Sequence, residues 1–101
     1  MALDAIGSAL TGVSSAFTKQ RTVAHNVANQ LTEDFRPQRV IQSEARTGGS
    51  RVEIERAATP QPVDLAAEFV GSEVASVQAK SSLRVIDTEL ELLGNLIDTL
   101  G

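Results

Sequence analysis

The stretch AHNVANQLTEDFRPQRV, residues 24–40, decides how the chain is divided. It holds the protein's single histidine, His25, and two asparagines three residues apart. Asparagine tolerates the left-handed backbone conformation and can bond backbone groups that are released where a helix ends. Pro37 then prevents a return to helix. The stretch therefore predicts a helix exit built on Asn26 and Asn29, followed by a turn.

Apolar residues before this exit follow a 3-4-3-4 spacing, which is typical of the packing side of a coiled-coil helix. The spacing runs over residues 3–31 with one polar interruption, at Gln20. It predicts one long helix over that range. We expect the side that carries Leu10, Val13 and Phe17 to pack against another helix of the same chain.

A second, longer helix is predicted over residues 63–100. Asp64 follows the sequence PQP and is a good candidate for its N-cap or first turn. The final third of this helix repeats the 3-4 spacing, which predicts a side that faces the first helix and contains Leu83, Ile86, Leu90 and Leu93.

The same final third has a second apolar stripe, formed by Val85, Leu92 and Leu96. It lies about 120° around the helix from the first stripe at 100° per residue. One partner helix covers only one of the two stripes, and exposed apolar stripes usually mark an interface. We therefore expect the second stripe to be an assembly interface.

Between the helices, the runs RVIQSEA and RVEIERA flank RTGGS and predict a β-hairpin with a Gly-Gly turn. The expected fold is mainly α, with two long antiparallel terminal helices that form a coiled-coil-like inner domain and a short hairpin between them. The 101 residues form one domain, with segments 1–32, 33–62 and 63–101.

Composition narrows the classes of function. The chain has no Cys, Trp or Tyr, and its net charge of −4 is concentrated in residues 63–101, which carry seven acidic and two basic side chains. No basic, aromatic-bearing face favours nucleic acid, and no apolar run favours membrane insertion. The beginning of the sequence lacks the features of a cleaved signal peptide.

The sequence favours a protein that is not an enzyme. A metal site on His25 would need a ligand three or four residues further along the helix, where Ala28 and Asn29 stand instead. Gly48 and Gly49 are predicted to form a turn and no phosphate loop, since no helix start follows them. We expect no catalytic, cofactor or metal site and no small-molecule substrate.

The exit region resembles the N-terminal signature of bacterial flagellar rod and hook proteins. That signature runs roughly Asn-(Ile/Val/Leu)-Ala-Asn-x-x-Thr-x-Gly-(Tyr/Phe)-(Lys/Arg), and the matching positions are Asn26, Ala28, Asn29, Thr32, Phe35 and Arg36. The stretch IGSALTG resembles the start of the same domain. The region from VDLAAEF onward is similar to the family's closing domain, at Val63, Asp64, Leu65, Glu68, Ala79, Val85, Ile86 and Thr88.

The resemblance implies a short proximal rod subunit, because the segment between the two matching regions has space only for the hairpin. In that family the terminal helices pair, and many copies stack helically around an export channel. The implied partners are further copies and other flagellar axial proteins. The implied route is export by the flagellar type III apparatus without a cleaved signal, to the rod that crosses the periplasm and transmits torque. Glu33 and Asp34 stand where the family usually has Pro and Gly.

A different class of protein also fits the residues. A helical-hairpin adaptor or secretion chaperone outside the flagellar axis would have the same two helices. Growth of particle mass with concentration would favour the rod subunit, and a closed dimer with a bound client would favour the adaptor.

Overall fold

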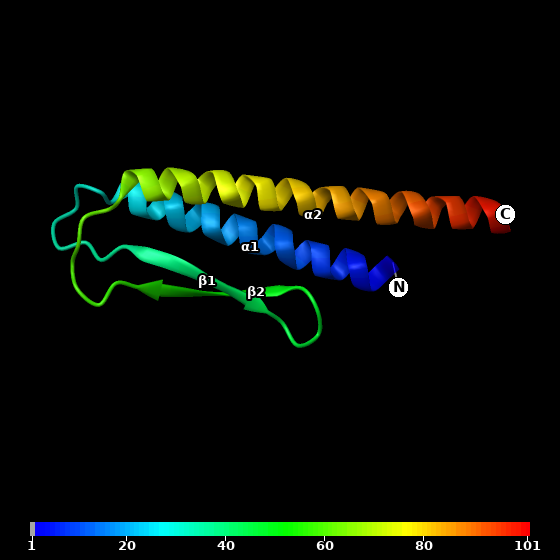
Figure 1. Cartoon of the computed structure of the whole chain (residues 1–101), viewed down its shortest axis with the longest axis horizontal. Helices are drawn as coiled ribbons and strands as arrows, with labels where there is room; N and C mark the ends of the chain where they lie inside the picture. The colour runs from blue at the N-terminus through cyan, green and yellow to red at the C-terminus, as the bar shows by residue number, and fades with distance from the viewer. Residues whose placement is uncertain (1) are drawn as a thin grey trace.

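The computed structural model describes residues 2–101 and has the predicted mainly helical fold. Two long antiparallel helices lie side by side, and a two-stranded β-hairpin lies along the shorter one (Figure 1). The molecule is a thin plank of 63 × 24 × 14 Å.

Helix α1 (Ala2–Ala28) ends inside the stretch that predicted an exit. The backbone N–H of Asn29 still donates to the carbonyl of His25 at 3.2 Å, and the chain then turns. Leu31 therefore lies outside the helix, although the apolar spacing placed it within.

The hairpin forms from strands β1 (Gln38–Glu44) and β2 (Ser50–Arg56), which pair antiparallel with Val40 opposite Ile54. Its turn needs glycine, because Gly48 and Gly49 have φ angles of +91° and +81°. A two-stranded hairpin is marginal by itself in water, so its stability depends on what it packs against.

The tip of the hairpin rests on α1. A Cβ atom at Gly49 would overlap the hydroxyl of Thr11, and the N–H of Ser50 donates to that hydroxyl at 2.9 Å. The hydroxyls of Ser50 and Ser15 are 2.8 Å apart. These contacts fix the hairpin along the hydroxyl-bearing side of α1.

Helix α2 (Leu65–Leu100) begins as the sequence predicts. Asp64 is its N-cap, and the carboxylate accepts a hydrogen bond from the N–H of Ala67 at 3.1 Å. Satisfying a free N–H in this way stabilises a helix start by about 1 kcal/mol. Within residues 2–101, neither helix combines enough length and apolarity to cross a membrane.

The two helices meet through small side chains. Ala16 and Ala75 are almost completely buried. A Cβ atom at Gly12 would overlap the hydroxyl of Ser82, and one at Gly71 would lie 3.8 Å from Val23. Small residues let two helix backbones approach closely, because interaxial distance is set by the side chains at the contact.

The predicted packing side is therefore wrong in its main residues. Leu10 and Phe17 are 55% and 65% exposed, and Leu83 and Leu90 are exposed as well. Only the remaining three predicted residues are half-buried, namely Val13, Ile86 and Leu93. At the helix separation that alanine and glycine allow, leucine and phenylalanine do not fit between the backbones, so these side chains turn to the outer surface.

Helix α2 continues past the beginning of α1 (Figure 1). Gly12 lies against Ser82 and Asn26 against Glu68, so the first turn of α1 is level with about residue 92 of α2. Residues 94–100 are all exposed. The last turns of α2 thus form an overhang without a partner helix in the described chain.

Enlarging a side chain in the alanine contact should destabilise the folded chain. We expect Ala75→Leu to lower the free energy of unfolding by about 1–3 kcal/mol, because the closely approaching backbones have no space for the added carbons. The control is Leu90→Gln, on an exposed side chain, which should change it by less than about 0.5 kcal/mol. Urea unfolding followed by circular dichroism measures both, and a larger loss in Leu90→Gln would restore the leucine seam as the intramolecular contact.

Candidate functional site

Asn26 joins three elements at one end of the plank. Its side chain is 0% exposed. The amide Nδ2 donates to the carbonyl of Gln38 at 2.7 Å, while Oδ1 accepts the N–H of Gln38 at 2.9 Å. The carboxamide thus pairs with the backbone of β1 as a neighbouring strand would.

The second N–H of the same Nδ2 donates to Oε1 of Glu68 in α2, at 2.8 Å. One side chain of α1 therefore binds both β1 and α2, and it uses both donors and its acceptor oxygen. A buried amide with every polar atom paired favours one arrangement of its partners, because leaving any of them unpaired is costly. Asn26 fixes the angle between the hairpin and the helices.

The rest of the exit is a compact turn. Nδ2 of Asn29 donates to the carbonyl of His25 at 2.9 Å, and the hydroxyl of Thr32 donates to Oδ1 of Asn29 at 3.1 Å. The carbonyl of Phe35 accepts the N–H of Gln61 at 3.2 Å, which ties the turn to the segment that leads into α2. Asn29 therefore has the helix-end role that the sequence predicts.

His25 packs on an aromatic ring at the surface. The centroids of His25 and Phe35 are 5.5 Å apart with the planes tilted by 54°. The remaining two signature residues, Ala28 and Arg36, are exposed. Within residues 2–101, no group of three His or acidic side chains is placed to hold a metal ion.

Asp34 occupies the turn position where the resembling family usually has glycine. Its φ angle is +56°, in the left-handed region. Among the residues that the structure describes, Asp34 alone has a positive φ without being glycine. Aspartate adopts this conformation at a moderate cost, whereas a β-branched residue adopts it rarely. The backbone at this position therefore has the conformation that a glycine would favour.

Polar side chains bridge α1 and α2 along the rest of their contact. Gln20 and Ser72 exchange two hydrogen bonds of 2.9 Å, one of them to the Ser72 carbonyl. Gln78 accepts from Lys19 at 3.0 Å and donates to the carbonyl of Gly12 at 2.9 Å. The apolar pattern of the sequence does not reveal these residues, because Gln20 only interrupts that pattern.

Two apolar stripes face away from the contact between the helices. The α1 stripe consists of Leu3, Ile6, Leu10, Val13 and Phe17, and most of it is exposed. The α2 stripe consists of the predicted assembly residues Val85, Leu92 and Leu96 and, further toward the N-terminus of α2, Val70, Val74 and Val77. All six side chains of the α2 stripe are exposed on this chain.

The extension of the α2 stripe has a periodic origin. Val70 and Leu92 are 22 residues apart, and Val74, Val85 and Leu96 are spaced by 11. Eleven residues correspond to three turns of a nearly straight helix, so side chains at this spacing stay on one side of α2. The 11-residue repeat is the signal that could have found Val70 and Val74, and Val77 lies seven residues after Val70.

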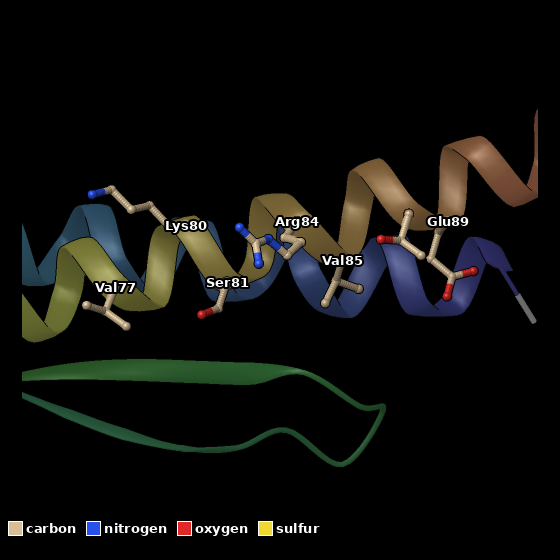
Figure 2. A pocket seen from close by; sticks show the side chains of 7 residues that line it. Val77, Lys80, Ser81, Arg84, Val85 and Glu89 are labelled. Carbon is tan, nitrogen blue, oxygen red and sulfur yellow. The ribbon is translucent and has the colours of Figure 1, made fainter.

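A groove lies along part of the α2 stripe. Its volume is about 440 Å³, and it is lined by Val77, Lys80, Ser81, Arg84, Val85, Thr88 and Glu89. Figure 2 shows Val77, Ser81 and Val85 pointing to the side of α2 on which the hairpin lies, whereas Lys80 points the other way. The groove therefore has an apolar floor and a charged rim, which suits a macromolecular contact.

The chain matches no protein-family model, and no curated protein is significantly similar to it in sequence.

The loss of stability caused by substitutions at the helix exit should increase with the burial of the substituted residue. Asn26→Leu removes three hydrogen bonds and leaves their half-buried partners unpaired, so a loss above about 2 kcal/mol is expected. Asn29→Leu removes an exposed helix-end bond and should cost about 0.5–2 kcal/mol. His25→Gln should change little. Chemical denaturation gives the ranking, and a larger loss of stability in His25→Gln than in Asn26→Leu would contradict it.

The left-handed turn gives a second comparison. Asp34→Val places a β-branched residue at positive φ and should cost about 1–2 kcal/mol. Asp34→Gly should be near neutral, since the relieved backbone strain is offset by the greater freedom of glycine in the unfolded chain. Thermal unfolding of the two variants tests this, and equal stability would show that residue 34 does not hold the left-handed conformation.

Proposed function

We propose that this protein is a structural subunit of the bacterial flagellar basal-body rod. Its partners are further copies and other flagellar axial proteins, which stack into a tube around an export channel and transmit torque. It reaches the rod through the flagellar type III export apparatus. Its role is mechanical, with no catalytic step and no cofactor.

One contact carries most of the proposal. The two regions that resemble the family lie near opposite ends of the chain. They meet where Asn26 donates to Glu68 at 2.8 Å, and each of these residues occupies a matching position of its region. Two chance likenesses have no reason to meet at a buried amide whose polar atoms are all paired, so the contact supports a common origin for both.

The turn gives a second line of support. Asp34 replaces the family's usual glycine, yet its φ angle of +56° is one that glycine adopts freely. The replacement thus leaves position 34 in a backbone conformation that is open to glycine. Because the backbone conformation is one that glycine adopts, the change from glycine to aspartate at this position counts little against the resemblance.

The distribution of apolar residues supports assembly as the role. Among the residues whose burial the structure describes, the buried apolar ones are three alanines, namely Ala9, Ala16 and Ala75. Most of the large aliphatic side chains, and Phe17 and Phe69, are exposed. Soluble monomers rarely leave long apolar stripes open to water. A subunit that becomes surrounded by copies would cover them.

The proposal is tested in the source bacterium. We expect deletion of the gene to abolish swimming and to stop flagella before the hook forms, and a tagged copy to restore motility and to co-purify with isolated basal bodies. A motile deletion strain with complete basal bodies would overturn the proposal. A soluble complex of the tagged protein with one flagellar or secreted client, without basal-body incorporation, would favour the adaptor.

A charge on the α2 stripe should separate folding from assembly. Leu92 is 56% exposed, so Leu92→Glu should leave the circular dichroism spectrum of the monomer unchanged. Inside a contact between subunits, the unpaired carboxylate would cost several kcal/mol. The expected cells export the variant and lack complete flagella, which motility assays and electron microscopy detect.

The matched control is Ser43→Glu, which adds the same charge at an exposed position of β1. It should leave motility normal. Wild-type motility with Leu92→Glu would remove this stripe from the assembly interface, and unfolding of that variant would place the stripe in the monomer's own core.

A further inference from the structure

The α1 stripe and the α2 stripe lie on opposite sides of the plank. The α1 stripe is about 140° around its helix from Thr11 and Ser15, which face the hairpin. The α2 stripe is on the hairpin side, because Val74 lines one pocket together with Val40 of β1. Neither stripe of a single chain therefore reaches the other.

Their charges differ in sign. Helix α1 carries Asp4, Lys19 and Arg21, a net charge of +1. Helix α2 carries six acidic and two basic side chains, and after Val85 it has four acidic side chains and no basic one. Two α2 stripes pressed together along this end would bring like charges close, whereas α1 against α2 pairs opposite net charges.

Their shapes also differ. The groove along Val77, Ser81 and Val85 is a shallow surface groove between side chains of one helix, and these three side chains point to the hairpin side (Figure 2). The α1 stripe bears the side chains of Leu3, Leu10 and Phe17 at seven-residue spacing, so they form one ridge along α1. A ridge of large side chains and a groove with an apolar floor are complementary surfaces.

We infer that the α1 stripe of one copy packs against the α2 stripe of the next copy. The occupant of the α2 groove is thus a second molecule of this chain, bound by a different surface from the one it fills. Such a heterologous contact leaves one free stripe at each end of a growing series, so copies add into a helical filament or a ring and do not close as a dimer. The inference deepens the proposed rod function and rests on it for its setting in the cell.

Two single-stripe variants of the full chain test the inference in solution. Phe17→Glu blocks the α1 stripe, and Leu92→Glu blocks the α2 stripe. Each charge should weaken the contact by about 100-fold or more, because it is buried without a partner. Analytical ultracentrifugation should therefore find the wild type growing with concentration, and each variant alone monomeric.

The decisive sample is the mixture. Leu92→Glu retains an intact α1 stripe and Phe17→Glu retains an intact α2 stripe, so the two should form a 1:1 dimer that grows no further. The control Ser43→Glu should assemble as the wild type does. If circular dichroism finds a variant unfolded, Leu10→Glu or Leu96→Glu replaces it on the same stripe.

Three results would overturn the inference. The first is a dimer of Phe17→Glu alone, which would mean that α2 stripes pair with each other. The others are a mixture that stays monomeric and a wild type that stays monomeric at all concentrations. None of them bears on whether the chain enters basal bodies. Incorporation in cells without self-association would refute this contact and leave the rod proposal standing. Self-association without incorporation into basal bodies would support this contact and refute the rod proposal.

Discussion

The close approach of α1 and α2 determines the rest of the structure. Because Gly12, Ala16, Ala75 and Ser82 form the contact, the helix backbones come too near for large side chains to lie between them. The aliphatic residues that usually fill a core are displaced to both outer sides. The chain thus has a well-defined contact between its helices and almost no hydrophobic centre, so its stability depends on close backbone packing and on polar bridges.

Asn26 gives this thin arrangement a fixed geometry. Its buried carboxamide pairs with the backbone of β1 as a neighbouring strand would, and the same group donates a hydrogen bond to Glu68 of α2. Two helices that touch through alanine could slide past each other with little change in packing. A fully paired amide at one end, together with the hydroxyl contacts of Ser50 at the other end of the hairpin, opposes that sliding.

The sequence predicted the elements well and their contacts poorly. The exit at Asn29, the N-cap at Asp64 and the Gly-Gly turn follow from local backbone chemistry, which neighbouring residues determine. The α1 spacing was also real, but a spacing shows only that a side is apolar and does not name the partner that covers it. Alanine, glycine and serine carry a weak hydrophobic signal. The side of each helix that packs within the chain therefore gave a weaker apolar pattern than the side that remains exposed. The α2 stripe was found only where leucines were dense, in the final third of the helix, and its three valines nearer the beginning of α2 were missed.

The overhang of α2 has a consequence for the order of the chain itself. Its backbone is hydrogen-bonded, ending with the N–H of Gly101 on the carbonyl of Ile97, but residues 94–100 are all exposed. A helix end without tertiary contacts opens at a free-energy cost near zero, far below that of the paired region. Its amide hydrogens would exchange fast in the free chain and slowly wherever a neighbour covers it. The C-terminal turns therefore behave as a separate folding unit, and part of the binding free energy of the neighbour goes into ordering them.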